Sequence, residues 1–587
     1  MQVRSRSGDK SSSTNRPSRM RPAERLEDRR LMSAAHHVLL LSVDGLHAAD
    51  VTDPQLQASL KNVIQLEATG ISYANASTTR PSDSFPGTLA YLTGATSRTT
   101  GVFYDDSYSR ALLPPTALGG GSTPGTETQY AENIDKNSAL LSGGGNFDAS
   151  SIDPRQLPRD PKTGLPVYPN QFLQVNTIFD VAHNAGLYTA FSDKHPAYQI
   201  AFGNDPKAIN DFYAPELNST TALLDTTTGH TVDANALLAT PSIDLTKYRL
   251  VDASTDPQGP NDPNLINDTT HNVLLTEKYD DLKVQAILNE IAGKASHTSP
   301  DITNPQVPAL FGMNFQAVSV AEKFYQGGIG LLPNGQQGAP SAILQAAISH
   351  TDASIGKIVA ALKSANLWSS TQVYLTAKHG QAPRVGSAGL MADSTLPDLL
   401  GKAGAPSAFA VQDDASLIYL KDQSKTATAV KTLQHFAATG TIQVYFQGVM
   451  QTLQASQVID KIIAQTGLTD NGFGNPLKTA TTPDIIVTLK PGYIWVGNPK
   501  KFNFKRGEHG GFSADDTRVG LIVSGGAVDK SVQGSTVYVP VATTQIAVSA
   551  LSALGLNPDQ LQGAHLERTK ALPGLFSAKV IAGHEHK

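Results

Sequence analysis

The chain has 587 residues, of which 40% are hydrophobic and 17% charged, and its formal net charge is −5. This length accommodates one large α/β domain with insertions or two to three ordinary domains. The small net charge gives no support to a nucleic-acid-binding surface, and no apolar run approaches the roughly 20 residues that a membrane span needs. Cysteine is absent, which excludes disulfides, thiolate metal sites and a cysteine nucleophile.

The first 35 residues differ in composition from the rest. They hold nine basic and four acidic residues, a balance of +5, among many Ser, Pro and Arg residues. Such a segment cannot bury a core, so we predict that residues 1–35 are disordered. The run from Arg25 to Ser33 resembles a sorting motif near the N-termini of exported bacterial proteins, which implies a secreted, cell-surface or periplasmic location. The alternative is a basic, solvated tail that carries no address.

From His36 onward, strand-like and helix-like segments alternate. The first strand, from His36 to Asp44, is apolar without alternation, which is typical of a parallel sheet covered on both faces. A helix is predicted next, with Asp53 as N-cap, Pro54 in its first position and Gly70 after its end. Later the same pattern recurs, with strands expected at 188–192, 309–313, 373–376, 485–488 and 519–524, and helices at 281–292 and 341–362.

This alternation predicts an α/β fold in which a doubly wound, mainly parallel central sheet has helices on both faces. Two stretches interrupt it. Residues 111–170 are rich in Gly, Pro, Ser and Thr and indicate a loop or lid insertion, and residues 400–480 indicate a small cap. We therefore expect one main domain over residues 36–545, including both insertions, followed by a C-terminal helix and tail over 546–587.

Polar side chains follow several of the predicted strands. Ligands bind at the carboxyl ends of the strands in open α/β sheets, so these residues are candidates for one common site. Four strand ends and a later glycine-rich loop contribute Asp44, Asp193-Lys194-His195, Asn314, Lys378-His379 and His509.

Ser84 stands at the start of a predicted helix that follows the first strand and its helix. The amide groups and the positive dipole end at a helix N-terminus favour an anion, which suits an alkoxide that attacks a phosphoryl group. The alternative is that Ser84 is an ordinary N-cap residue.

Taken in order, these motifs resemble the alkaline phosphatase superfamily and, within it, the type I phosphodiesterase/nucleotide pyrophosphatase family. The resemblance covers about 37–540 and rests on Asp44-Gly45, Ser84-Phe85-Pro86, His379-Gly380 and His509-Gly510. It implies an alkaline-phosphatase-like fold with the catalytic site at the carboxyl edge of the sheet, and Ser84 as the nucleophile. It also implies a divalent metal, zinc first, as one or two ions held by Asp44, His379 and His509.

The chain departs from the family pattern at three positions. The family usually shows Asp-His-Gly where this chain has Lys378-His379-Gly380, and Asp with His four residues later where this chain has Asn314 and Val318. An amide is a poor zinc ligand and an aliphatic side chain is none. The ammonium group of Lys378 would offset the charge of a phosphate in place of a lost metal, so Lys378 is a catalytic candidate.

Further candidates lie near the same strand ends. Lys194 and His195 are predicted to be catalytic, as a phosphate-binding cation and a general acid. Asn314, Asp193 and His47 are candidate substrate-binding residues.

The resemblance implies metal-assisted hydrolysis of a phosphoester in a small molecule or nucleotide. The expected bond is a phosphodiester or a nucleotide pyrophosphate, cleaved through a covalent intermediate on Ser84. A phosphomonoesterase fits the same residues, whereas Thr88 stands where a sulfatase needs Arg. The alternative from another class is a degenerate surface protein that binds without cleaving, which the replacements at Asn314, Val318 and Lys378 favour.

Overall fold

The computed structural model describes residues 35–130, 134–238, 243–255, 269–325, 338–384, 388–446 and 448–576. Apart from Ala35, the N-terminal segment predicted to be disordered lies outside the described residues, as do residues 577–587 of the predicted tail. Within these ranges, no helix is long and apolar enough to cross a membrane.

The largest sheet has eight strands, and most of its neighbouring pairs run parallel. The strands predicted at residues 36–44, 188–192, 309–313 and 373–376 form its centre, whereas β23 runs antiparallel to both neighbours. Their order across the sheet is β24 (Ser535–Val537), β2 (Ile71–Tyr73), β23 (Ile522–Ser524), β12 (Thr371–Thr376), β1 (His37–Val43), β11 (Leu310–Phe315), β6 (Thr189–Ser192) and β7 (Asp211–Tyr213).

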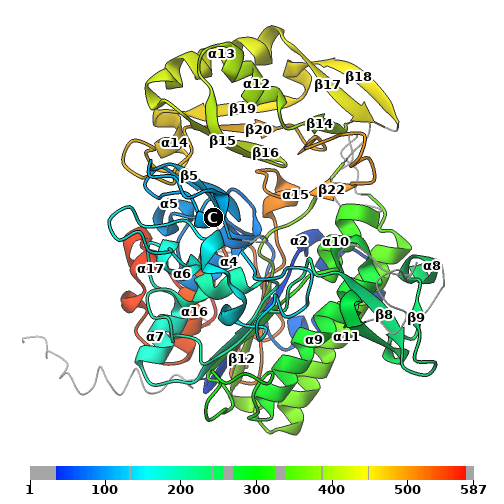
Figure 1. Cartoon of the computed structure of the whole chain (residues 1–587). Helices are drawn as coiled ribbons and strands as arrows, with labels where there is room; N and C mark the ends of the chain where they lie inside the picture. The colour runs from blue at the N-terminus through cyan, green and yellow to red at the C-terminus, as the bar shows by residue number, and fades with distance from the viewer. Residues whose placement is uncertain are drawn as a thin grey trace, which may run out of the picture. The chain divides into compact units, whose positions relative to one another are not determined.

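Successive residues of β1 face opposite sides of this sheet, and each side is covered by helices. Val38 and Leu40 belong to a core shared with α4 (Ser84–Thr93), α7 (Ile178–Asn184) and α16 (Thr544–Ala553). Leu39, Leu41 and Val43 belong to a second core, shared with α3 (Lys61–Ala68), α9 (Val273–Ile291), α10 (Ala317–Tyr325) and α11 (Ala342–Ser364). Figure 1 shows the two helix layers on either side of β12. The predicted doubly wound fold is confirmed.

The prediction of one helix between Asp53 and Gly70 is wrong for the first half of that segment. The structure has a short helix α2 (Ala48–Thr52), a 3₁₀ turn at Gln57–Ser59, and then α3. Asp53 ends α2, and its Oδ1 accepts the backbone N–H of Gln55 at 2.6 Å. The N-terminus of α3 is capped from a distance, because Asp352 of α11 accepts the N–H groups of Asn62 and Val63, each at 2.9 Å. Sequence patterns near α3 cannot reveal a cap that lies 290 residues away.

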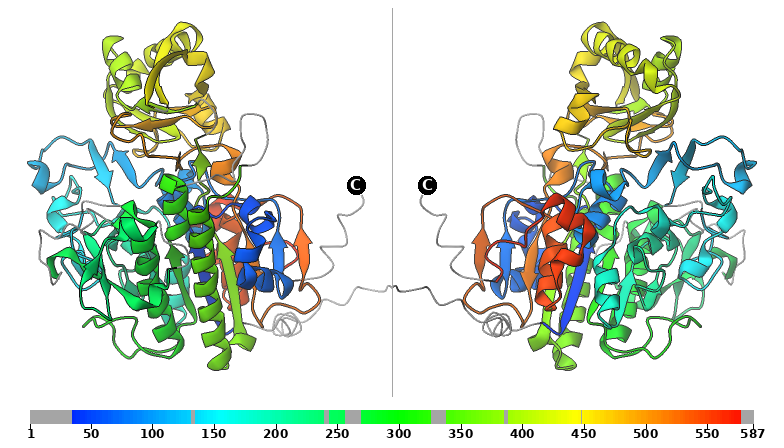
Figure 2. Two further views of the ribbon diagram at one scale, coloured as in Figure 1. Left: turned by 90° about the vertical axis from the view of Figure 1, so that its right-hand side faces the viewer. Right: turned by 90° about the vertical axis from the view of Figure 1, so that its left-hand side faces the viewer.

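A smaller unit with its own core follows the central strands (Figures 1 and 2). Its two four-stranded sheets are β18-β17-β14-β21 and β15-β16-β20-β19, and α12 (Thr395–Lys402) and α13 (Thr426–Thr439) pack against them. The strand predicted at residues 485–488 is β20 (Ile485–Leu489), which pairs antiparallel with β16 (Ala415–Leu420) and β19 (Ile459–Ala464). Its residues alternate between two buried cores. It therefore has the continuous apolar pattern of a strand in the large sheet, although it belongs to the smaller unit. The remaining strands are β14 (Leu390–Ala392), β15 (Ser407–Gln412), β17 (Thr441–Phe446), β18 (Val449–Gln454) and β21 (Ile494–Val496).

Residues 111–170 contain little regular structure. β5 (Thr126–Gln129) pairs with β4 (Asp106–Ser109), and three short 3₁₀ turns and α6 (Pro169–Phe172) follow or flank it. At the C-terminal end, α16 packs into the first core and α17 (Gln562–Glu567) follows.

Candidate active site

Four neighbouring parallel strands bring the predicted site residues to one edge of the sheet. In the order β12, β1, β11 and β6, register pairs Ser42 with Thr376 and Asn314, and Met313 with Ser192. The residues that follow these positions therefore emerge together at the carboxyl end of the sheet, as the sequence predicts. They are Asp44, Asp193, Lys194, Lys378 and His379.

Ser84 is the first residue of α4 and is fully buried. Asp83 precedes it as the extended N-cap residue. The helix lies directly against the loop after β12, because a Cβ atom at Gly87 would come within 2.0 Å of the Lys378 carbonyl oxygen. Glycine at this position allows the helix N-terminus to reach the strand ends.

The Ser84 hydroxyl lies between a cation and an imidazole. Lys194 Nζ donates a hydrogen bond to Ser84 Oγ at 2.9 Å, and His379 Nε2 lies 3.4 Å from the same oxygen. His379 Nδ1 is 2.8 Å from the carbonyl oxygen of Gly380, which can only accept a hydrogen bond. The proton of a neutral His379 is therefore on Nδ1, and the lone pair of Nε2 faces Ser84.

Asp44 is the buried carboxylate of the site. Its Oδ2 accepts hydrogen bonds from Gln316 Nε2 at 2.7 Å and Asn314 Nδ2 at 3.3 Å, and it lies 3.6 Å from His379 Nε2 and 3.8 Å from Lys194 Nζ. Burial alone would raise the pKa of Asp44, but the charges of Lys378, His379 and Lys194 outweigh burial and hold it well below its usual value. Asp44 is therefore ionised at neutral pH.

Lys378 forms a buried ion pair beside these groups. Its Nζ donates to Asp193 Oδ1 at 2.7 Å and to the Tyr198 hydroxyl at 3.0 Å. Burial lowers the pKa of Lys378 to about 8, even though Asp193 and Asp44 oppose this shift. Burial also disfavours the charged form of Lys194, but Asp44, Asp105 and Asp193 outweigh burial and raise its pKa above the ordinary value. Lys194 is therefore a cation at neutral pH.

His509 reaches the site from the loop after β22 (Gly507–Glu508). Its ring centroid lies 3.9 Å from that of His379, and its Nδ1 is 3.3 Å from Asp83 Oδ1. Burial and the neighbouring His379 lower the pKa of His509 to about 4, despite the contact with Asp83. His509 is therefore neutral at neutral pH.

Two predicted site residues, His195 and His47, have polar partners other than Ser84 and Asp44. His195 Nδ1 lies 2.7 Å from Glu216 Oε1, and its ring stacks at 6.4 Å from that of Tyr198, so it borders the Lys378 side of the site. His47 contacts Asp50, Glu322 and the backbone of Gln381, which form a second polar cluster beyond the Asp44-Gly45 turn.

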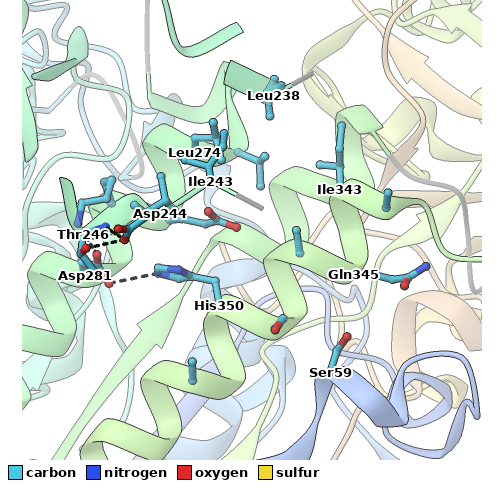
Figure 3. A pocket seen from close by; sticks show the side chains of 18 of the residues that line it. Ser59, Leu238, Ile243, Asp244, Thr246, Leu274, Asp281, Ile343, Gln345 and His350 are labelled. Atoms are coloured by element: carbon cyan, nitrogen blue, oxygen red, sulfur yellow. Dashed lines mark hydrogen bonds and ion pairs between the residues drawn. The ribbon is translucent and has the colours of Figure 1, made fainter. Parts of the chain in front are cut away.

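The site is almost closed to solvent. Asp44, Ser84, Lys378 and His379 are each 0% exposed, and access remains at Lys194, whose side chain is 12% exposed, and at His509. A cavity of about 800 Å³ lies elsewhere, between α9, α11 and the segment around Asp244 (Figure 3). None of the predicted site residues lines this cavity.

Comparison with known proteins places this arrangement in a family. Residues 38–121 and 175–512 match the model of the family "Type I phosphodiesterase / nucleotide pyrophosphatase". The chain belongs to this family. The family resemblance inferred from the motifs is therefore confirmed, although no curated protein matches the chain by sequence.

Solved structures agree on the fold. Murine ectonucleotide pyrophosphatase/phosphodiesterase 5, as an inactive threonine-to-alanine variant in complex with AMP, aligns with a TM-score of 0.51 and 12% identity, covering 89% of this chain and 96% of the other. A further structure of the same murine protein aligns with a TM-score of 0.50 and the same identity and coverage. At this identity the likeness shows the fold, which is the alkaline-phosphatase-like one expected.

The donors around Ser84 do not fit the two-metal centre that the family implies. Nitrogen donors from Gln316, Asn314 and Lys194 surround Asp44 Oδ2, and an ammonium group stands at Lys378. Asp44 Oδ1 has no hydrogen-bond partner among the described residues, yet no set of three metal-capable side chains closes around it. Asp44, His379 and His509 lie near one another, but His379 turns to Asp44 and His509 to Asp83.

Sequence reasoning missed three residues of this site. Asp83 could have been found from its place before Ser84. Gln316 lies two residues after Asn314, just past the end of β11, and both side chains donate to Asp44 Oδ2. Tyr198, which holds Lys378, comes from the 3₁₀ segment Pro196–Phe202 and carries no local signal.

Proposed function

We propose that this protein hydrolyses phosphodiester or nucleotide pyrophosphate bonds through a covalent intermediate on Ser84. One observation carries the proposal: Ser84 Oγ lies at the N-terminus of α4, 2.9 Å from Lys194 Nζ and 3.4 Å from His379 Nε2. Membership of the phosphodiesterase family supports the reaction class.

His379 is suited to act as the general base. Its Nδ1–H is held by the Gly380 carbonyl, so Nε2 can take the Ser84 hydroxyl proton as Oγ attacks phosphorus. The new bond is Oγ–P, and the bond from phosphorus to the leaving oxygen opposite Oγ breaks; the leaving oxygen departs as an anion and takes a proton from water. Asp44, 3.6 Å from Nε2, stabilises the transient imidazolium. Water then attacks phosphorus from the side that the leaving group vacated and releases a proton to the solvent. The P–Oγ bond breaks, and Nε2 returns its proton to Oγ, which restores Ser84.

The cations stabilise the charge that develops. Lys194 is protonated at neutral pH because of the carboxylates near it, so it acts as an electrostatic donor and not as a base. Together with the amide groups at the start of α4, it would receive the phosphoryl oxygens. A metal ion takes no part in these steps, because the donors around Asp44 do not fit one.

The substrate class follows from the family and from one structural relative. The murine relative was captured with AMP, and a nucleotide phosphoester is therefore the first class to test here. Access past Lys194 and His509 would place a phosphate beside the cation.

The test is hydrolysis of bis(p-nitrophenyl) phosphate and p-nitrophenyl phosphate by the wild type and by variants. Ser84→Ala should lower the diester rate roughly 10³-fold or more, and Lys194→Met by roughly 10²-fold. The control is Ser97→Ala, because Ser97 is a buried serine whose Oγ has no hydrogen-bond partner among the described residues. Full activity in Ser84→Ala would show that Ser84 is not the nucleophile. If the wild type hydrolyses the monoester faster than the diester, the protein is a phosphomonoesterase.

A binding protein is the second candidate, and the substituted residues at Lys378 and Asn314 favour it. It predicts saturable AMP binding that depends on Lys194, with no turnover of any of these phosphoesters. Turnover that Ser84→Ala abolishes would exclude it.

The location outside the cytoplasm is also a proposal, supported by the motif at Arg25–Ser33. Fractionation of cells that express the full chain would test it, and a purely cytoplasmic protein would contradict it.

A further inference from the structure

A second buried polar cluster lies beside the catalytic loops. His47 precedes α2, Asp50 lies within α2, and Glu322 comes from α10. The three side chains are 4%, 0% and 2% exposed, respectively. Their donor atoms all lie within 4.8 Å of one another, and this is the set of three metal-capable side chains that the described residues contain.

The distances in this cluster match those around a bound metal ion. His47 Nδ1 is 3.0 Å from Asp50 Oδ2 and 3.4 Å from Glu322 Oε1. Two ligands on bonds of about 2.1 Å are separated by about 3.0 Å at a right angle and about 3.4 Å at a tetrahedral angle. The separations of His47 Nδ1 from both carboxylates therefore suit a shared ion.

Three of the four carboxylate oxygens of the cluster lack hydrogen-bond partners among the described residues, whereas Asp50 Oδ2 accepts the backbone N–H of His47 at 2.6 Å. Within the described residues, neither oxygen of Glu322 has a hydrogen-bond partner, and Asp50 Oδ1 has none. A buried carboxylate without compensation is costly, and a divalent cation would neutralise both carboxylates.

The imidazole is held in the orientation that a metal ligand needs. His47 Nε2 lies 2.9 Å from the carbonyl oxygen of Gln381, and the backbone N–H of Gln381 points at the same nitrogen, with 3.1 Å between the two nitrogens. When Nε2–H donates to that carbonyl, the lone pair of Nδ1 points at Asp50 and Glu322. Metal-binding histidines are commonly fixed by such a hydrogen bond from the other ring nitrogen.

A glycine allows the Glu322 carboxylate to pack against the turn that follows Asp44. Gly45 has φ of +85°, and a Cβ atom there would come within 2.7 Å of Glu322 Oε2. The glycine after Asp44 thus leaves room for the Glu322 carboxylate.

We propose that His47, Asp50 and Glu322 bind one divalent transition-metal ion, zinc or manganese. One nitrogen and two carboxylate oxygens are a ligand set that both ions accept. The ion would be structural, because its ligands would tie the loop after Asp44 and α2 to α10. The proposal is independent of the hydrolytic function proposed above.

The test uses the full chain, dialysed against a chelator and then incubated with ZnCl₂ or MnCl₂. Elemental analysis of the desalted protein should give about one ion per chain, and the melting temperature should rise by several degrees when the metal is added. Glu322→Gln should weaken metal binding at least about tenfold and abolish the rise in melting temperature. Glu290→Gln is the matched control, because Glu290 is also a buried glutamate with both oxygens unpartnered among the described residues, and it should keep the metal.

His47→Gln provides a second variant in case Glu322→Gln does not fold, and it should also lose the metal. A wild type that takes up neither ion and shows no melting shift would overturn the proposal and leave an ion triad of His47 with two carboxylates. Metal that is retained in Glu322→Gln and His47→Gln but lost in His379→Gln would also overturn it, because the ion would then lie at the catalytic residues.

Discussion

Asp135 illustrates how a single buried carboxyl can shape the response of this protein to pH. Burial raises its pKa to about 9, and repulsion from Glu216 acts in the same direction. The unfolded chain ionises Asp135 near pH 4, whereas the folded chain keeps it protonated. Its contribution to the free energy of unfolding is therefore complete below about pH 4 and is lost as pH rises toward 9, by up to about 1.4 kcal/mol per pH unit.

We expect Asp135→Asn to flatten the fall in melting temperature between pH 5 and 9 and to raise stability at the alkaline end. The measurement is thermal unfolding across this range, with the exposed Asp301→Asn as control. Equal slopes in the wild type and Asp135→Asn would show that Asp135 is already ionised in the folded protein.

At the residue scale, the side chains that contact Ser84 could be predicted from the sequence, but not all of the residues to which those side chains hydrogen-bond. Asp44, Lys194 and His379 follow strand ends, and strand order alone brings them together. The sequence predicts His47 as a substrate-binding residue near the same strand end, and in the structure its side chain contacts Asp50 and Glu322. Which way a loop side chain turns depends on packing against α10, which is distant in sequence.

At the element scale, the position of α4 depends on its contact with the loop after β12. Gly87 lies so close to the Lys378 carbonyl that a methyl group cannot fit, so Gly87→Ala must move the helix or the loop. Because Ser84 starts this helix, we expect activity to fall by roughly tenfold or more, together with a loss of about 1–3 kcal/mol in the free energy of unfolding.

Gly401→Ala is the matched control, because Gly401 lies in α12 and a Cβ atom there meets nothing within 4 Å. It should be neutral or stabilising by up to about 1 kcal/mol, as alanine is the better helix former. Denaturant unfolding and diester hydrolysis measure both effects. Gly87→Ala with wild-type activity would show that α4 can shift without disturbing Ser84.

The elements themselves were predictable to different extents. β1, β6, β11 and β12 follow from short apolar runs. The helices predicted at 341–362 and 281–292 correspond to α11 and to the second half of α9. The start of α3 was missed because Asp352 of α11 caps it. β20 was found as a strand, but its place in the smaller unit depends on β16 and β19, whose pairing no local pattern specifies.

At the scale of the whole molecule, the smaller unit and the central sheet are linked close to the active site. Tyr104 donates to Asp413 Oδ2 at 2.6 Å, and Lys323 of α10 is 2.8 Å from Glu508 Oε1. Glu508 immediately precedes His509, and β22 pairs with β13 (Ala382–Pro383), just after His379. The chain that returns from the smaller unit thus delivers His509 beside His379. The sequence predicts the fold class, but this link arises from contacts between segments more than 100 residues apart.

The covalent intermediate on Ser84 is the central claim, and trapping it is the most direct test. The wild type is mixed with bis(p-nitrophenyl) phosphate, quenched in acid during turnover, digested and examined by mass spectrometry. We predict a p-nitrophenyl phosphoryl adduct on Ser84 that disappears after a chase and is absent from Ser84→Ala. Turnover without an adduct on Ser84, or with an adduct on another side chain, would contradict the account.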